Sequence, residues 1–173
     1  MRFPPATHLV ILTRTESAEV AAYVEGKVEG WLGLRVNRDK TRVVDLKERG
    51  ASVGFLGYTF RYDRDLYGGG RRYLNVAPSK KALARQRAKL RALTGSAESF
   101  RPLPELIGRL NRQLAGWAGY FGYGYPRAAF REVNRYVRLR LSRHLRRRSQ
   151  RRYRPPKGTS LYAHLAEMGL VYL

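Results

Sequence analysis

The sequence contains no cysteine, which excludes a disulfide scaffold and any zinc site built on thiolates. The three histidines, His8, His144 and His164, have no spacing typical of a metal site or of a partner for a catalytic nucleophile. No apolar run approaches the length of a membrane span, and residues 1–5 lack the apolar core of a signal peptide. We therefore expect a cytoplasmic protein that has no membrane partner and no metal site.

Acidic residues are also scarce in this chain. The 173 residues include 13 Asp and Glu against 35 Lys and Arg, a formal net charge of +22. Most of the imbalance lies after residue 50, where 26 basic residues face 6 acidic ones, whereas residues 1–50 contain 9 and 7. Such a surplus binds phosphate backbones by releasing counterions, and aromatic side chains among the bases can stack on unpaired nucleobases. The composition therefore predicts a nucleic-acid partner.

Residues 1–78 have the pattern of a small α/β unit. The apolar run of residues 9–12 predicts a strand, and residues 13–16 have the spacing of a helix capping box. The amphipathic helix that follows is expected to end near Gly33. Further strands are expected at residues 41–46, 54–60 and 72–76, the last two joined by a flexible hairpin loop around the glycines of residues 68–70.

Residues 79–173 have the pattern of basic helices. Ser79 predicts the start of a first helix, the apolar stripe of residues 103–117 indicates a second, and a third begins at Arg127. Ser160 can cap a short last helix. The predicted fold class is α+β, a short β-sheet with one helix followed by an all-helical basic domain.

Five short segments occur in the order found in one known protein family. They are residues 9–12 (LVIL), 33–41 (GLRVNRDKT), 54–58 (GFLGY), 73–81 (YLNVAPSKK) and 116–121 (GWAGYF). Together they resemble the C-terminal part of group II intron reverse transcriptases, also called maturases. The resemblance implies that residues 1–78 are the end of a truncated polymerase palm. It implies that residues 79–173 are the thumb, or maturase-specific domain X.

The sequence departs from this family at the polymerase metal site. In the family, the strand that matches residues 9–12 directly follows Tyr-Ala-Asp-Asp, whose aspartates hold two magnesium ions. Thr7 and His8 stand at the aspartate positions here. Neither side chain replaces a carboxylate, and a two-metal site needs several anionic oxygens. We therefore expect no cofactor, no catalytic residue and no polymerase activity of the chain alone.

Two residues of the first 78 are candidate contacts because of the resemblance. Lys40 matches the lysine of the family's Asn-x-x-Lys-Thr segment, which lies near the incoming nucleotide or primer. The alternative interpretation of Lys40 is a solvated lysine before a strand. Tyr58 lies in a segment that resembles the primer grip, and the same segment can be a core hairpin.

The aromatic residues near position 120 divide into two groups. Trp117 and Phe121 continue the apolar stripe of the second helix, so we expect them in the core. Tyr120, Tyr123 and Tyr125 fall off that stripe and are better candidates for contact with RNA.

Arginine dominates the largest cationic run, which extends from residue 127 to residue 157 and holds 13 bases and one acid. The planar arginine fork bonds phosphate oxygens in pairs and stacks on bases, so we prefer RNA contact to a merely solvated face. The predicted nucleic-acid contacts are Lys40, Tyr58, Lys80, Lys81, Arg85, Arg87, Tyr120, Tyr123, Arg131, Arg135, Arg138, Arg143, Arg146, Arg147, Arg151 and Arg152.

The leading hypothesis is a maturase-like protein that binds structured group II intron RNA and assists splicing through binding energy alone. The first alternative is the C-terminal half of a split or truncated RNA-directed DNA polymerase, completed by another polypeptide. A decayed reading frame without a selected function is the second alternative. The third is a basic protein that binds RNA or DNA without specificity.

Overall fold

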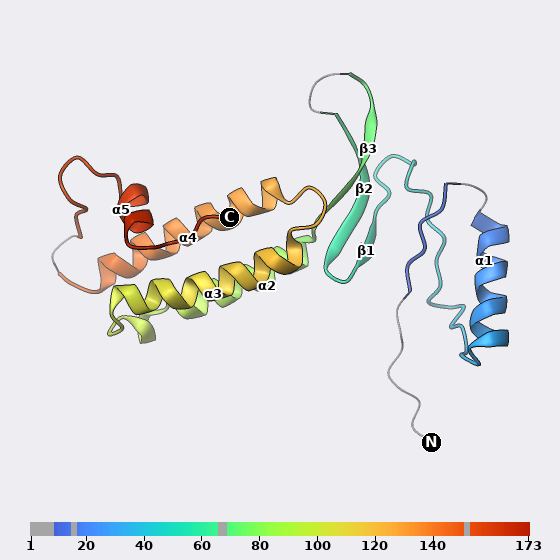
Figure 1. Ribbon diagram of the computed structural model, residues 1–173, viewed down its shortest axis with the longest axis horizontal. Helices are drawn as coiled ribbons and strands as arrows, with labels where there is room; N and C mark the ends of the chain where they lie inside the picture. Colours follow the sequence, from blue (N-terminus) through green and yellow to red (C-terminus); the bar gives the residue numbers. More distant parts are fainter. Residues whose placement is uncertain (1–8, 15–16, 66–68, 151–152) are drawn as a thin grey trace. The chain divides into compact units, whose positions relative to one another are not determined.

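The computed structural model divides the chain into two compact units, residues 1–51 and residues 52–173, and each is described by itself. The order of helices and strands is drawn in Figure 1. The fold class is α+β, which confirms the prediction. The residues that the structure describes are 9–14, 17–65, 69–150 and 153–173.

The described part of residues 1–51 contains one helical segment. α1 (Ser17–Gly26) continues directly into a π-helical turn, η1 (Lys27–Trp31). Gly33 follows with a φ of +61°, a left-handed conformation that glycine adopts without steric cost. The predicted helix and its end near Gly33 are confirmed. Residues 15 and 16 of the expected capping box lie outside the described residues.

Two strands predicted for this unit do not form in the described residues. Neither residues 9–12 nor residues 41–46 are paired in a sheet. Apolar and β-branched residues favour a strand only where a neighbouring strand bonds the backbone and a packed surface receives the side chains. The described part of this unit supplies no such neighbour, so both predictions were wrong.

The second unit begins with a three-stranded antiparallel sheet in the order β1 (Val53–Phe55), β2 (Tyr58–Arg64) and β3 (Arg72–Pro78). β2 and β3 pair along their whole length, which confirms the predicted hairpin. The single strand predicted for residues 54–60 is wrong, because the chain reverses at Leu56 and Gly57. Their φ angles of +47° and +85° match the two-residue turn whose twist suits a hairpin.

Four α-helices follow the sheet, and two of their starts are capped by the predicted serines. The Ser79 hydroxyl accepts the Ala82 amide at 3.1 Å, and the Ser160 hydroxyl accepts the Ala163 amide at 3.1 Å. None of the helices in the described residues combines the length and apolar character needed to cross a membrane. The helices are α2 (Lys80–Leu93), α3 (Leu103–Phe121), α4 (Arg127–Arg147) and α5 (Leu161–Glu167), with a 3₁₀ turn η2 (Ser96–Glu98) after α2.

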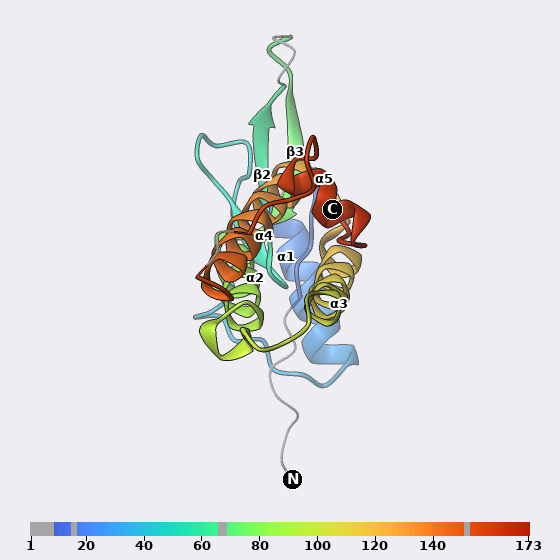
Figure 2. The ribbon, with the colours of Figure 1, turned by 90° about the vertical axis from the view of Figure 1, so that its left-hand side faces the viewer.

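The core of this unit lies between the helices. α2, α3 and α4 run side by side, and the sheet extends from one end of the group (Figures 1 and 2). Trp117 and Phe121 belong to the core, as predicted. The fully buried apolar side chains at its centre are Leu90, Leu106, Leu110, Leu114, Val133, Val137, Leu141 and Leu165.

The loop between α3 and α4 joins the helices to the sheet. The Tyr125 amide donates to the Val76 carbonyl of β3 at 2.8 Å. Gly124 has a φ of +79°, and a β-carbon at this position would lie 2.3 Å from the same carbonyl oxygen. Only glycine therefore permits this approach, which fixes the sheet against the end of α3.

Candidate nucleic-acid interface

Five arginines lie on the solvent side of α4, and we call them the α4 arginine face. Steps of three, four and eight residues keep them on one side of the helix, opposite its buried stripe. At 1.5 Å per residue the row is about 28 Å long. Its members, all exposed, are Arg127, Arg131, Arg135, Arg138 and Arg146.

No carboxylate forms an ion pair with the α4 arginine face within the described part of the chain. Glu132, the one acid of α4, pairs instead with Arg87 of α2, with 2.5 Å between Oε1 and NH1. Arg138 lies over the ring of Tyr162, 5.5 Å from its centre, in a cation–π contact. The charge of the face is therefore available to a polyanion.

The other predicted basic residues of the helices are placed differently. Lys80, Lys81 and Arg85 are exposed on α2. Arg87 is half-buried and held by its ion pair with Glu132. Arg143 and Arg147 are exposed near the end of α4, and an NH2 group of Arg147 donates to the Thr94 carbonyl at 2.7 Å. Arg151 and Arg152 lie outside the described residues, as do Thr7 and His8.

Tyr58 and Tyr120 contact each other across the hairpin turn. The Tyr58 hydroxyl donates to the Tyr120 carbonyl, and the Tyr120 hydroxyl donates to the Leu56 carbonyl at 2.9 Å. The Tyr58 ring also lies 5.1 Å from the ring of Phe121, and burial raises the pKa of Tyr58. The two tyrosines hold the β1–β2 turn against the end of α3, while 53% of Tyr120 stays exposed.

Tyr123 and Tyr125 occupy the loop after α3. Tyr123 is 75% exposed, and Tyr125 is 57% exposed with its ring 5.0 Å from Tyr73 in an edge-on contact. Their exposure agrees with the expectation that they fall off the apolar stripe. Tyr123 in particular presents a ring to solvent on which a base can stack.

Lys40 lies in a turn of the first unit. The turn is closed by Asn37, whose side-chain oxygen accepts the Lys40 amide at 3.2 Å and whose carbonyl accepts the Thr41 hydroxyl at 2.9 Å. Lys40 itself is exposed. The motif of residues 37–41 therefore has a local structural role that presents Lys40 to solvent.

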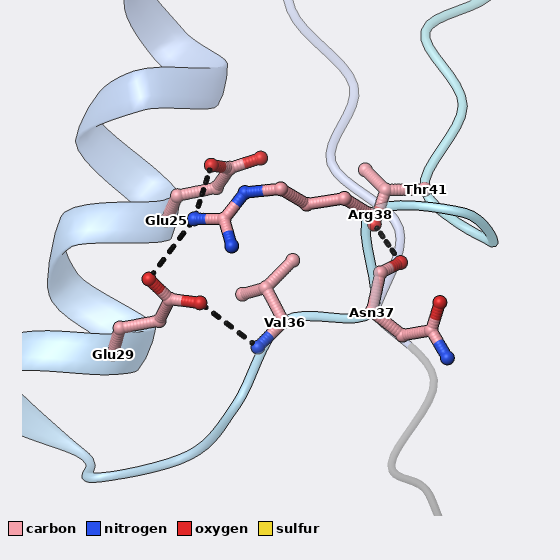
Figure 3. Close-up of polar contacts among 6 residues, drawn as sticks. All are labelled: Glu25, Glu29, Val36, Asn37, Arg38 and Thr41. Carbon is pink, nitrogen blue, oxygen red and sulfur yellow. Dashed lines mark hydrogen bonds and ion pairs between the residues drawn. The ribbon is translucent and has the colours of Figure 1, made fainter.

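An ion-pair cluster beside this turn ties the loop to α1 and η1, as drawn in Figure 3. Arg38 lies 3.4 Å from Glu25 and 3.1 Å from Glu29. The Val36 amide donates to Glu29 at 3.2 Å. This amide and then Arg38 lower the pKa of Glu29. Sequence reasoning missed this cluster, although the two glutamates are four residues apart, the spacing at which helical side chains share a side.

Arg140 is a second feature that sequence reasoning missed. Only 8% of this residue is exposed, and its Nε donates to the Thr94 hydroxyl at 2.9 Å. One NH2 group donates to the carbonyls of Thr94 at 3.2 Å and of Arg91 at 3.3 Å. The signal in the sequence was its position beside Leu141 at the edge of the apolar stripe. Such a position buries a helical side chain.

In the described ranges, no three or more acidic or histidine side chains are grouped so that they could hold a metal ion.

Comparison with known protein families gives one match. Residues 83–159 match the family described as the maturase-specific domain of group II introns. This part of the chain is similar to a group II intron maturase-specific domain. The match confirms the resemblance for the C-terminal part of the chain and includes the whole α4 arginine face. No curated protein matches the chain.

Proposed function

We propose that this protein binds structured group II intron RNA and assists splicing by stabilising the folded intron, whose own RNA carries out the catalysis. The observation that carries the proposal is the α4 arginine face inside the maturase-specific domain. A row of unpaired guanidinium groups about 28 Å long suits a phosphate backbone rather than a small ligand.

The proposed mechanism relies on binding energy alone. The arginines contact phosphates and fix the position of the RNA. Such phosphate contacts do not by themselves distinguish one RNA sequence from another. Exposed aromatic rings such as Tyr123 add stacking of about 1–3 kcal/mol per base where a base is unpaired. Recognition of the folded intron then follows from the spacing of these contacts over the RNA surface.

A salt titration tests the proposal. The purified chain is bound to a folded group II intron RNA and to a random RNA of equal length between 50 and about 300 mM salt. We expect tighter binding to the intron and faster splicing of the intron in the presence of the protein. Equal affinities with the same salt dependence would reduce the protein to a nonspecific basic binder.

The proposal extends to the parts of the chain that resemble a polymerase. We propose that residues 1–78 are the end of a palm and residues 79–173 a thumb, and that the chain alone does not extend a primer. Thr7 and His8 in place of the family's aspartates support this. Magnesium-dependent extension of a primer on an RNA template by the purified chain would contradict it.

One observation favours a second candidate function, the C-terminal half of a split polymerase. None of the described residues between 9 and 51 is buried, and several large apolar side chains there are exposed. A second polypeptide that supplies fingers and palm would cover such a surface. Co-purification of a protein encoded next to this reading frame tests the candidate, and its absence from the purified complex would remove it. The exposed apolar residues are Leu9, Ile11, Leu12, Tyr23, Trp31, Leu32, Leu34, Val43 and Val44.

A further inference from the structure

A pocket at the C-terminal end of α2 is lined by three arginines. Arg91 comes from α2, and Arg140 and Arg147 come from the last turns of α4. The turn between α2 and η2 supplies Gly95 and Ser96 to the same pocket. The pocket thus combines guanidinium groups from two helices with a small, polar turn.

The positive charge in this pocket is not balanced by a carboxylate. Among the described residues, none of the three arginines forms an ion pair. The hydrogen bonds of Arg140 all go to neutral oxygens, the Thr94 hydroxyl and the carbonyls of Thr94 and Arg91. These carbonyls belong to the end of α2, where the helix dipole compensates only about half a charge.

The buried position of Arg140 makes this imbalance costly. A charge that is removed from water needs a counter-charge, and hydrogen bonds to neutral groups replace only part of its hydration. Burial lowers the pKa of Arg140, and the nearby Arg147 and Arg91 act in the same direction. An anion in the pocket would supply the missing counter-charge and would oppose the lowering of the Arg140 pKa.

The geometry selects the kind of anion. Within the described part of the chain, Arg147 donates one hydrogen bond, to the Thr94 carbonyl, although a guanidinium has five donors, and both Arg147 and Arg91 are exposed. Forked donors from several arginines that line one pocket suit the tetrahedral oxygens of a phosphate. Arg146, the last member of the α4 arginine face, precedes Arg147 but points about 100° away from it around the helix, so an RNA backbone on that face reaches the pocket by passing around the C-terminal end of α4.

We propose that this pocket binds a phosphate group, which in the complex with RNA is a backbone phosphate. The second half of this statement rests on the proposed function, whereas the first half does not. The pocket then serves as a fixed point for the RNA, because the guanidinium groups of Arg140 and Arg147 are held by carbonyls at the end of α2 before the ligand arrives.

Titration with inorganic phosphate tests the pocket without RNA. The ¹⁵N-labelled full chain is titrated at pH 7, with chloride replaced by phosphate at constant ionic strength. We expect saturable shifts of the Gly95 and Ser96 amide resonances in the wild type. In Arg91→Gln/Arg147→Gln we expect them to be lost. Absence of saturable shifts in the wild type, or equal shifts in this variant, would overturn the proposal.

Two further variants guard against a loss caused by misfolding. Ser96→Asp places a carboxylate in the pocket and is expected to abolish the phosphate-induced shift of Gly95, because it occupies the anion site. Ser96→Asn has the same shape without the charge and is expected to keep the shift. If both Ser96 variants lose the phosphate-induced shift of Gly95, or if both keep it, the result would contradict an anion site.

Intron RNA distinguishes the two phosphate sources. We expect Arg91→Gln/Arg147→Gln to weaken RNA binding about tenfold at 0.15 M salt and to reduce the salt slope by about one. The charge-matched control Arg42→Gln/Arg49→Gln changes two exposed residues of the first unit and should weaken binding less than twofold. If the two double variants bind intron RNA equally well, while the wild type shows the saturable shifts with inorganic phosphate, the pocket takes free phosphate only. Failure of the wild type to prefer intron RNA would contradict the proposed function and leave the phosphate result standing.

Discussion

The described residues of 9–51 and those of 52–173 differ in how they are held together. In the first region no side chain is buried, and its distinctive contacts are polar, between Arg38, Glu25 and Glu29 at the surface. In the second region a continuous core of leucines, valines and aromatics connects α2, α3, α4 and α5. Exposed ion pairs add little to stability, whereas buried apolar side chains supply most of it.

Charge divides between the same two regions. Residues 1–50 are nearly neutral, and residues 51–173 carry most of the positive surplus. A strongly charged surface opposes compaction through self-repulsion. The region that we propose binds RNA therefore needs the larger core, because it must stay folded before the RNA arrives.

Matched truncations of leucine test where the stability lies. Leu110 is fully buried and Leu12 is 52% exposed. We expect Leu110→Ala to lower the free energy of unfolding by about 2–5 kcal/mol and Leu12→Ala to change it by less than about 0.5 kcal/mol. Urea denaturation followed by circular dichroism measures both. Similar losses would mean that the first region has a core of its own.

Alanine at two glycines tests how the sheet is joined to the helices. Gly124→Ala combines a left-handed φ with a clash against the Val76 carbonyl, so we expect a loss of about 2–4 kcal/mol. Gly116→Ala is the control, since Gly116 lies in α3 and an added β-carbon there would have no neighbouring side chain within 4 Å. There we expect a gain of about 0.5–1 kcal/mol from helix propensity. Thermal unfolding compares the two, and a neutral Gly124→Ala would contradict the close approach.

The division of charge is tested by removing three charges from each region. Arg131→Gln/Arg135→Gln/Arg138→Gln should weaken binding to intron RNA by about 30-fold, or about 2 kcal/mol, and reduce the salt slope by about two. The control carries Arg14→Gln/Arg42→Gln/Arg49→Gln, three exposed residues of the first region. Filter binding across a salt series measures both. Equal losses would place the RNA surface on both regions.

The buried His144 should make the stability of the second region depend on pH. Burial, with Arg147 and Arg148, lowers the pKa of His144, while the Thr94 backbone acts in the opposite direction. As the pH falls below the ordinary value of 6.5, the unfolded chain binds a proton that the folded chain does not. We expect the free energy of unfolding to decrease there by at most about 1.4 kcal/mol per pH unit.

His144→Gln provides the control for this pH dependence. The substitution removes the titrating group, so the decrease between pH 6.5 and 5 should become smaller whatever the stability at pH 7. Urea midpoints at several pH values measure the slope. An unchanged slope would mean that the His144 pKa is the same in the folded and unfolded chains.

Local patterns in the sequence were sufficient for the helices of the second region. Ser79 and Ser160 cap the helices that they were predicted to cap, because a cap depends only on residues three positions away. The stripe from Leu103 to Trp117 is buried as predicted, since a period of 3.6 residues fixes one face of a helix. The exposed arginines of α4 follow from the same geometry.

Strands were less predictable because they depend on neighbours. Residues 41–46 have strand-forming side chains, yet the described chain offers them no partner. Residues 54–60 looked like a single strand, because Leu56 is not a typical residue for a turn with positive φ. Its conformation is supported by the Tyr120 hydroxyl, which is 64 positions away in the sequence.

Composition and local patterns were enough to predict a basic α+β protein with a helical domain resembling that of group II intron maturases. Charge, caps and apolar periodicity are properties of neighbouring residues, so they can be read without a structure. Tertiary packing, in contrast, buries Arg140 on the end of α2 and brings three arginines to the lining of one pocket. Such a pocket depends on how α2 and α4 pack, and that packing joins residues about 50 positions apart in the chain.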